Sequence, residues 1–191
     1  MLTLETAPVR LPVDMADVRQ QLRIDGDAED PAMDRLLRVA TSFVDGRGAL
    51  GRAMITQSWA QHVGPNPGNV KIAMLPFQSL TSVKYYDAAG TLQTATLGDF
   101  EVIGAENSKT VRPKDGFSWP ATDDRPDAIK ITYVAGYGDD PEDVPESTRH
   151  ALLMLVAHWF ERREPSSDRD MLEMPWSVEA LLNIERTRWY G

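Results

Sequence analysis

Apolar residues recur at helical spacing near the start of the chain. Asp14 is expected to cap a first helix whose stripe is Met15, Val18 and Leu22, before "DGDAED" breaks the pattern. For a second helix we expect Asp30 as the cap and Pro31 as the first helical residue. Its apolar positions follow the i, i+3, i+4, i+7 rule at Met33, Leu36, Leu37, Ala40, Phe43 and Val44. The sequence therefore predicts two amphipathic helices, and the following "GRGALGR" (46–52) indicates a chain reversal, not an anion-binding loop.

The period changes to two between about Thr56 and Val134, which is typical of strands. The alternating runs are "TQSWAQHV", "VKIAML", "SVKYY", "TLQTATL", "DFEVI", "TVRP" and "AIKITYV". Clusters of Pro, Gly, Asn and Asp separate them, and "PNPGN" (65–69) and "DAAG" (87–90) are predicted to be hairpin connections. The pattern predicts a small antiparallel β unit.

A long apolar helix is predicted after Pro145, which suits a first helical position. Positions 151–160 are apolar except for His158, so the helix presents apolar side chains on every side. This run rises about 15 Å, half of the ~30 Å core of a bilayer, and Arg149, Arg162 and Arg163 bracket it. We therefore exclude a membrane span. The helix must be covered by its own chain or by another subunit.

The last segment predicts a helix over 177–190, after the polar break "RREPSSDRDMLEMP". Val178, Leu181, Leu182, Glu185 and Trp189 align on it. The order of helices, strands and helices predicts an α+β fold. A helical core domain comes from both chain ends, residues 1–55 and 144–191, with a small antiparallel β subdomain inserted at 56–143.

Composition limits the function classes. The net charge of -9 and the pI near 4.8 argue against a protein whose main task is to grip nucleic acid. The chain has no cysteine, which excludes disulfides and thiolate metal sites. "MLTLETAPVR" lacks the features of a signal peptide, so we expect a protein made in the cytoplasm.

No catalytic motif stands out, and the sequence predicts neither an enzyme nor a bound metal or cofactor. His62, His150 and His158 do not form a ligand set, and we expect His158 to be a packed, hydrogen-bonded core residue. The acidic clusters "TDDRPD" and "YGDDPEDVPE" lack the ligand spacing of a calcium loop. Asp99 and Glu101 lie at i, i+2, as an acid-base pair would, but chance explains such pairs in so acidic a chain.

Four segments in order resemble the head-tail connector (adaptor) proteins of long-tailed phages and gene transfer agents. They are "VDGRGALGRAMITQSW" (44–59) behind a capped amphipathic helix, "IAMLPFQSLTSVKYYDAAGTLQT" (72–94), "DFEVI" (99–103) and "ITYVAGYGDDPEDVPESTRHALLMLVAHWFERRE" (131–164). The resemblance spans roughly residues 14 to 185. The order and spacing of the four segments make it more specific than the similarity of any one segment alone. It implies a helical core with an inserted β region and a mechanical role without catalytic residues.

The resemblance implies a dodecameric ring of copies beneath the portal protein that extends the DNA channel toward a stopper or tail-terminator protein. DNA would pass without specific binding, no membrane would be involved, and the protein would move from the bacterial cytoplasm to the particle neck. Arg162 and Arg163 are inter-subunit candidates, although a solvated helix end explains them equally well. The portal-interface candidates are Leu181, Leu182, Ile184, Arg186, Arg188, Trp189 and Tyr190. A stopper or tail-completion protein, or a stand-alone ligand-binding module, are the alternatives.

Overall fold

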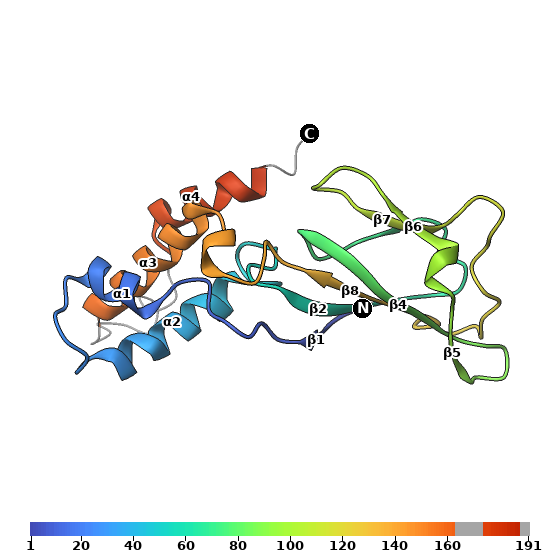
Figure 1. Ribbon diagram of the computed structural model, residues 1–191, viewed down its shortest axis with the longest axis horizontal. Helices are drawn as coiled ribbons and strands as arrows, with labels where there is room; N and C mark the ends of the chain where they lie inside the picture. Colours follow the sequence, from blue (N-terminus) through green and yellow to red (C-terminus); the bar gives the residue numbers. More distant parts are fainter. Residues whose placement is uncertain (163–173, 188–191) are drawn as a thin grey trace. The chain divides into compact units, whose positions relative to one another are not determined.

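The chain divides into a helical unit and a β unit, each made of segments distant in sequence. The structure, a computed structural model, describes residues 1–162 and 174–187. The helical unit comprises 9–55 and 137–191, and the β unit comprises 1–8 and 56–136. Within these described ranges, four helices and antiparallel sheets confirm the predicted α+β class (Figure 1). The unit boundaries differ from the expected ones, because residues 1–8 join the β unit and residues 137–143 join the helical unit.

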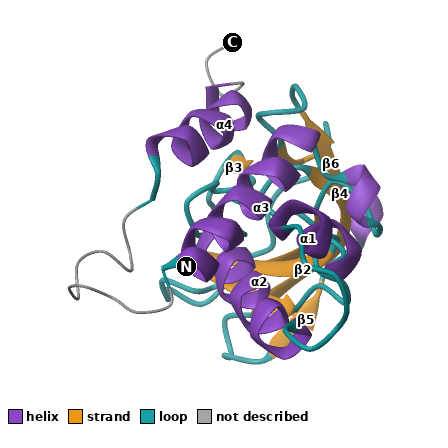
Figure 2. Ribbon diagram, turned by 90° about the vertical axis from the view of Figure 1, so that its left-hand side faces the viewer, coloured by secondary structure: helices purple, strands orange, loops and turns teal. Residues whose placement is uncertain are grey.

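The helical unit is built around α3 (Glu146–Glu161), which contacts each of the other three helices. These are α1 (Met15–Leu22), α2 (Asp30–Val44) and α4 (Trp176–Thr187), and a short 3-10 helix, η2 (Pro141–Asp143), precedes α3. Figure 2 shows α1, α2 and α3 side by side. The predicted apolar stripe of α2 is confirmed: Met33, Leu37, Ala40 and Val44 are buried in the core, and Leu36 and Phe43 pack against it.

The predicted N-caps of the first two helices fare differently. Asp14 is the N-cap residue of α1, as predicted, although its side chain makes no capping hydrogen bond. Asp30 is the first residue of α2, and Glu29 is in the capping position. The carboxylate of Asp30 instead accepts a hydrogen bond from Arg19 Nε at 2.8 Å, which ties α2 to α1 and holds the pKa of Asp30 below its usual range. Pro145 likewise precedes the first residue of α3 as its cap.

The reversal predicted after α2 is confirmed. Gly46 has a left-handed φ of 55°, and the Met54 amide donates to Asp45 Oδ1 at 2.7 Å. A Cβ on Gly48 would lie 2.4 Å from the carbonyl oxygen of Phe43, so this position accepts only glycine without local movement. The turn delivers Met54 and Ile55 to the core of the helical unit.

The β unit contains two antiparallel sheets, ordered β1-β2-β8-β4-β5 and β3-β7-β6. The larger sheet has β1 (Leu2–Thr6), β2 (Gln57–Val63), β4 (Phe77–Tyr86), β5 (Leu92–Thr94) and β8 (Ile129–Ala135). The smaller has β3 (Val70–Lys71), β6 (Phe100–Ile103), preceded by the 3-10 helix η1 (Leu97–Asp99), and β7 (Thr110–Pro113). Every predicted strand run overlaps an observed strand, although β4 begins five residues before the predicted "SVKYY".

One face of the larger sheet forms the core of the β unit. In β8, Ile129, Ile131, Tyr133 and Ala135 are buried in strict alternation. The Tyr133 hydroxyl accepts a hydrogen bond from the Met74 amide at 3.0 Å, and burial raises the pKa of Tyr133 to about 12. This face is therefore covered by the chain that leads from β3 to β4.

Two strand predictions were wrong. Strands were expected only within about 56–135, yet β1 pairs with β2 through Leu2↔Gln61, Thr3↔Ala60 and Leu4↔Trp59. The alternation "LTLET" carried that signal. "DAAG" (87–90) does close the hairpin of β4 and β5. "PNPGN" (65–69) does not close a hairpin, because β2 and β3 belong to different sheets.

Candidate interaction surface

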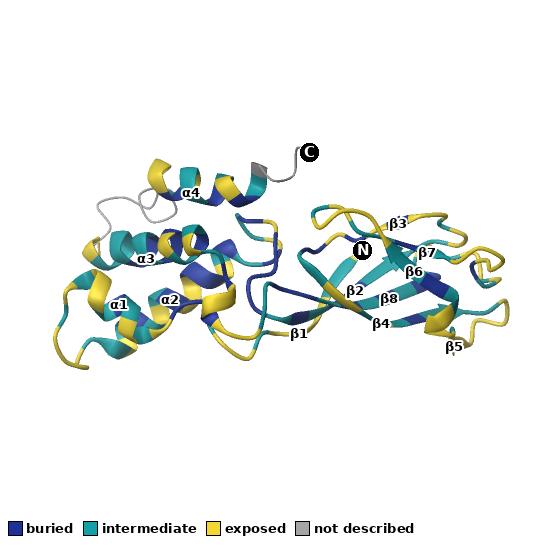
Figure 3. Cartoon of the chain, turned by 45° about the horizontal axis from the view of Figure 1, so that its top comes forward, coloured by how far each residue is buried: buried dark blue, intermediate teal, exposed yellow. Residues whose placement is uncertain are grey.

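Helix α4 is the element on which most of the predicted interface residues lie. Its inner face is part of the core, since Val178 and Leu182 are 0% exposed and Leu181 packs against the core. Figure 3 shows both buried and exposed positions along α4. The helix is thus held to α3 by apolar packing. This corrects the expectation that Leu182 offers a surface to a partner: Leu182 belongs to the core, and Leu181 is half-buried.

A polar cluster fixes the same helix. Glu185 is only 3% exposed, and its carboxylate accepts hydrogen bonds from the Tyr137 hydroxyl at 3.3 Å and from Ser147 Oγ at 3.4 Å. Arg52 is also buried and interacts with Tyr137, and burial raises the pKa of Tyr137 to about 12. A buried carboxylate needs such donors because an unpaired one is costly. This cluster therefore explains why Glu185, a charged residue, lies on the same face of α4 as Val178 and Leu182.

The outer face of α4 is where an apolar surface remains. Ile184 is 49% exposed and Trp176 is 82% exposed, and the half-buried Ala180 lies between them at i+4 spacing. Trp176 was not singled out from the sequence, although it opens the helix directly after Pro175. An exposed tryptophan beside an isoleucine is a typical anchor for a protein partner. We refer to Trp176, Ala180 and Ile184 as the outer stripe.

The predicted arginine anchors divide into two groups. Arg186 is half-buried, and its guanidinium donates to Asn183 Oδ1 at 3.0 Å and to the carbonyl of Ala49. Arg186 therefore holds α4 to the turn after α2, which is a stabilising contact within the unit. Arg188, Trp189 and Tyr190 lie outside the described residues, as does Arg163. Arg162 is exposed just beyond the end of α3.

The long apolar helix α3 is covered unequally. Thr148, Ala151, Leu152, Leu155 and Val156 are buried. The remaining positions from Leu153 to Phe160 are half-buried, including His158, so the helix is not enclosed on all sides. Trp159 packs edge-on against Phe43 of α2 at 6.1 Å between ring centroids. Among the described residues, no helix is long and apolar enough to cross a membrane.

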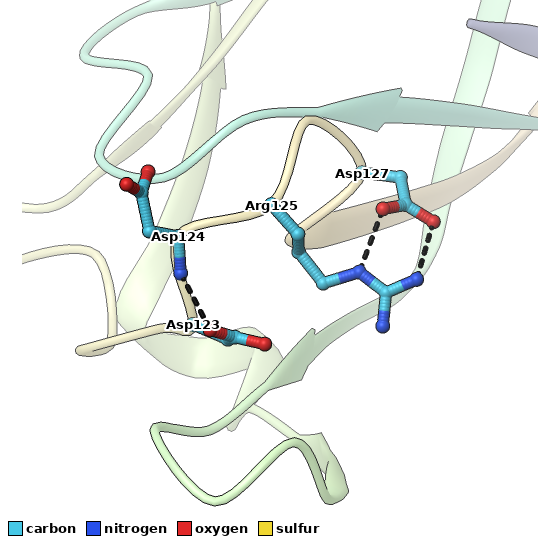
Figure 4. A network of polar contacts seen from close by, with 4 residues as sticks. All are labelled: Asp123, Asp124, Arg125 and Asp127. Carbon is cyan, nitrogen blue, oxygen red and sulfur yellow. Dashed lines mark hydrogen bonds and ion pairs between the residues drawn. The ribbon is translucent and has the colours of Figure 1, made fainter.

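The acidic clusters are organised by arginines and turns. In the β unit, Arg125 donates to both carboxylate oxygens of Asp127 at 2.7 and 2.9 Å, and the Asp124 amide donates to Asp123 Oδ1 at 2.8 Å (Figure 4). Arg125 also lies 3.9 Å from the ring centroid of Tyr86. In the helical unit, Asp140 and Asp143 form a capping box at η2.

The described ranges show no catalytic arrangement among the residues considered from the sequence. Asp99 belongs to a 3-10 helix and not to a strand, and Glu101 is paired with Arg112 at 2.8 Å. The three histidines lie on β2 and α3, and no group of three or more His, Cys, Asp or Glu in residues 1–162 and 174–187 could hold a metal ion.

Comparison with known proteins identifies the fold. The sequence matches no protein-family model and no curated protein sequence. A chain in the neck of the empty gene transfer agent (GTA) particle, computed with C6 symmetry, matches with a TM-score of 0.76 at 22% identity, over 97% of this chain and 94% of that chain. A chain in the virion of the native GTA particle matches with a TM-score of 0.73 at 23% identity, over 99% and 94%. A chain in the neck of the native GTA particle, computed with C12 symmetry, has a TM-score of 0.71 at 22% identity, over 97% and 94%. The protein therefore has, over nearly its whole length, a fold that is found in gene transfer agent particles.

Proposed function

We propose that the protein is a head-tail connector (adaptor) subunit of the neck of a phage or a gene transfer agent particle. The observation that carries the proposal is the fold match over 97% of this chain and 94% of a chain from a GTA neck. Such near-complete coverage of both chains is what a shared place in an assembly requires. Structures of this fold computed with C6 and C12 symmetry support a ring of neighbouring copies. The role is structural, and the protein is made in the bacterial cytoplasm before it joins the particle.

The partially covered α3 fits this proposal. A subunit in a ring has two lateral neighbours, which cover apolar positions that a monomer leaves half exposed. Arg162, at the end of the same helix, would meet acidic groups of a neighbour, and Arg163 follows it in sequence. The net charge of -9 suits a channel that lets DNA pass without holding it.

We assign the portal contact to the C-terminal end of the chain. The outer stripe on α4 supplies an apolar surface, and Arg188, Trp189 and Tyr190, which follow in sequence, supply the residue types that anchor interfaces. Leu182 and Arg186 act indirectly, since they hold α4 in place. The portal protein on one side and a stopper or tail-terminator protein on the other are the proposed partners.

The test is cosedimentation of purified protein with filled heads that lack connectors. Trp176→Ala combined with Ile184→Glu should weaken attachment by roughly 30-fold, because an aromatic anchor contributes about 2 kcal/mol or more to an interface. Val39→Glu is the matched control: Val39 is 52% exposed on α2, so it introduces the same charge on another surface of the helical unit. Thermal melts show whether each variant is folded.

Three outcomes contradict parts of the proposal. Undiminished attachment of the folded outer-stripe variant would move the portal contact elsewhere. Equal loss in Val39→Glu would show that charge alone, and not the outer stripe, matters. Failure of the unchanged protein to attach to such heads, with attachment to heads that already carry a connector, would indicate a stopper or tail-completion protein.

A further inference from the structure

The larger sheet has one face that the segment between β3 and β4 does not cover. On the inner face, Gln61 Nε2 donates to the Lys71 carbonyl at 2.9 Å, and the Ala73 amide donates to Gln61 Oε1 at 3.0 Å. Together with the Met74–Tyr133 bond, these contacts place the segment after β3 against that face. The side chains that alternate with Gln61 and Tyr133 point the other way. We call that side the open face.

The strand register arranges the open face in rows that cross the sheet. The middle row is Thr3, Ala60, Thr132 and Ser82, and the row beside it is Thr6, Ser58, Val134 and Ser79. Most of these side chains are hydroxyls on exposed or half-buried residues. A surface of this kind has many hydrogen-bond donors and little apolar area to bury.

The third row is cationic. His62 lies opposite Lys130, Lys130 lies opposite Lys84, and Lys84 lies opposite Thr94. Strands lie about 4.8 Å apart, so His62, Lys130 and Lys84 span about 10 Å across three strands. Like charges directly opposite each other destabilise a sheet, and an ion pair with Glu5 offsets the charge of only one of the two lysines, Lys130.

Few carboxylates offset the positive charge of this row. Glu5 lies 3.1 Å from the Lys130 ammonium, and Asp127 is engaged by both guanidinium nitrogens of Arg125 (Figure 4). Burial and the nearby charge of Lys130 lower the pKa of His62. The lasting positive charges of the row are therefore those of the two lysines, of which Lys130 is paired with Glu5.

We propose that the open face contacts the phosphodiester backbone of duplex DNA, with Lys84 and Lys130 as the phosphate-facing cations. Lysine and hydroxyl side chains are common donors to phosphate, whereas Lys and Ser are depleted at protein interfaces. A row of such donors can contact a repeating anion without reading bases. The inference rests on the proposed function, in which DNA passes through the neck, and it names the surface that meets that DNA.

The contact must be weak. Two lysines neutralise about two phosphates, which gives a slope of log K against log salt of roughly -2. The net charge of -9 opposes binding further. We therefore expect measurable binding of a short duplex only well below physiological salt, as suits a surface over which DNA slides.

The experiment measures fluorescence anisotropy of a short labelled DNA duplex against salt concentration. Lys84→Gln with Lys130→Gln should remove most of the salt-dependent binding and lower the slope by about 2. Lys109→Gln with Lys114→Gln is the matched control, because these lysines lie at the two ends of β7 in the smaller sheet and their loss changes the net charge equally. Lys84→Gln alone, which leaves the Lys130–Glu5 pair intact, should halve the effect.

Each result bears on one proposal. No binding by the unchanged protein at low salt, or equal losses in the two double variants, would overturn the inference. The inference would also be overturned if the Lys84/Lys130 variant bound DNA normally but lost self-association in sedimentation. The open face would then contact a neighbouring copy of the chain. The same variant should attach to connector-free heads like the unchanged protein. Failure of the unchanged protein to attach, with salt-dependent DNA binding intact, would refute the neck role but not the open face.

Discussion

Replacing Leu182 by alanine tests the assignment of α4 to the core of the helical unit. Leu182 has 0% of its surface exposed and belongs to the same core cluster as Leu155 and Val178. Removing a buried leucine side chain to alanine costs about 3–5 kcal/mol, from the lost transfer free energy and from the cavity that remains. Ile184, two positions later, is 49% exposed, so Ile184→Ala should cost about 1 kcal/mol or less. The two substitutions remove similar side chains from one helix but from opposite environments.

The assay is urea unfolding followed by far-ultraviolet circular dichroism, which the helices dominate. Leu182→Ala should lower the midpoint strongly without changing the slope, whereas Ile184→Ala should leave the midpoint nearly unchanged. A loss below about 1 kcal/mol for Leu182→Ala, or equal losses for the two variants, would refute the core assignment.

Truncation follows the same reasoning. Removing residues 181–191 takes away the buried Leu182 and Glu185, so we expect this deletion to unfold or strongly destabilise the helical unit. Removing 188–191 alone spares both residues, and it is the truncation suited to the head-attachment assay.

Three further predictions concern other parts of the chain. Glu185→Leu should destabilise the helical unit by about 2 kcal/mol or more, because it leaves the Tyr137 hydroxyl without its charged acceptor. A double-mutant cycle with Tyr137→Phe, measured by urea unfolding, should show a coupling energy between the two residues. Additive losses would contradict the cluster. Gly48→Ala should cost about 1–3 kcal/mol in thermal melts, since its Cβ meets the Phe43 carbonyl; an unchanged melting temperature would contradict the tight turn. Because the pKa of His62 is lowered in the folded state, protonation favours unfolding, so stability should fall as pH drops below about 6.5 toward the folded pKa. His62→Gln should flatten that part of the pH profile in urea titrations, and an unchanged profile would exclude His62 as the cause.

The sequence alone determined most of the local structure, because apolar periodicity depends on which face of each element must be buried. The apolar stripe of α2 and the alternation of β8 were predicted from residue order alone. The apolar side chains of both patterns are buried as predicted. The glycines of 46–52 also predicted the chain reversal after α2. The same reasoning could have found β1, whose alternation is as regular as that of the longer strands.

The tertiary structure decided which apolar and charged residues are available to a partner. Leu182 and Ile184 are two positions apart and equally apolar, yet packing on α3 buries the first and leaves the second exposed. Burial of Glu185 depends on hydrogen-bond donors from distant segments, among them Tyr137 and Ser147. The facing of Lys84 and Lys130 depends on a register between strands more than forty residues apart, and no local pattern encodes that pairing. Long-range contacts set these features, because burial and charge pairing are properties of neighbours in space and not of neighbours in sequence.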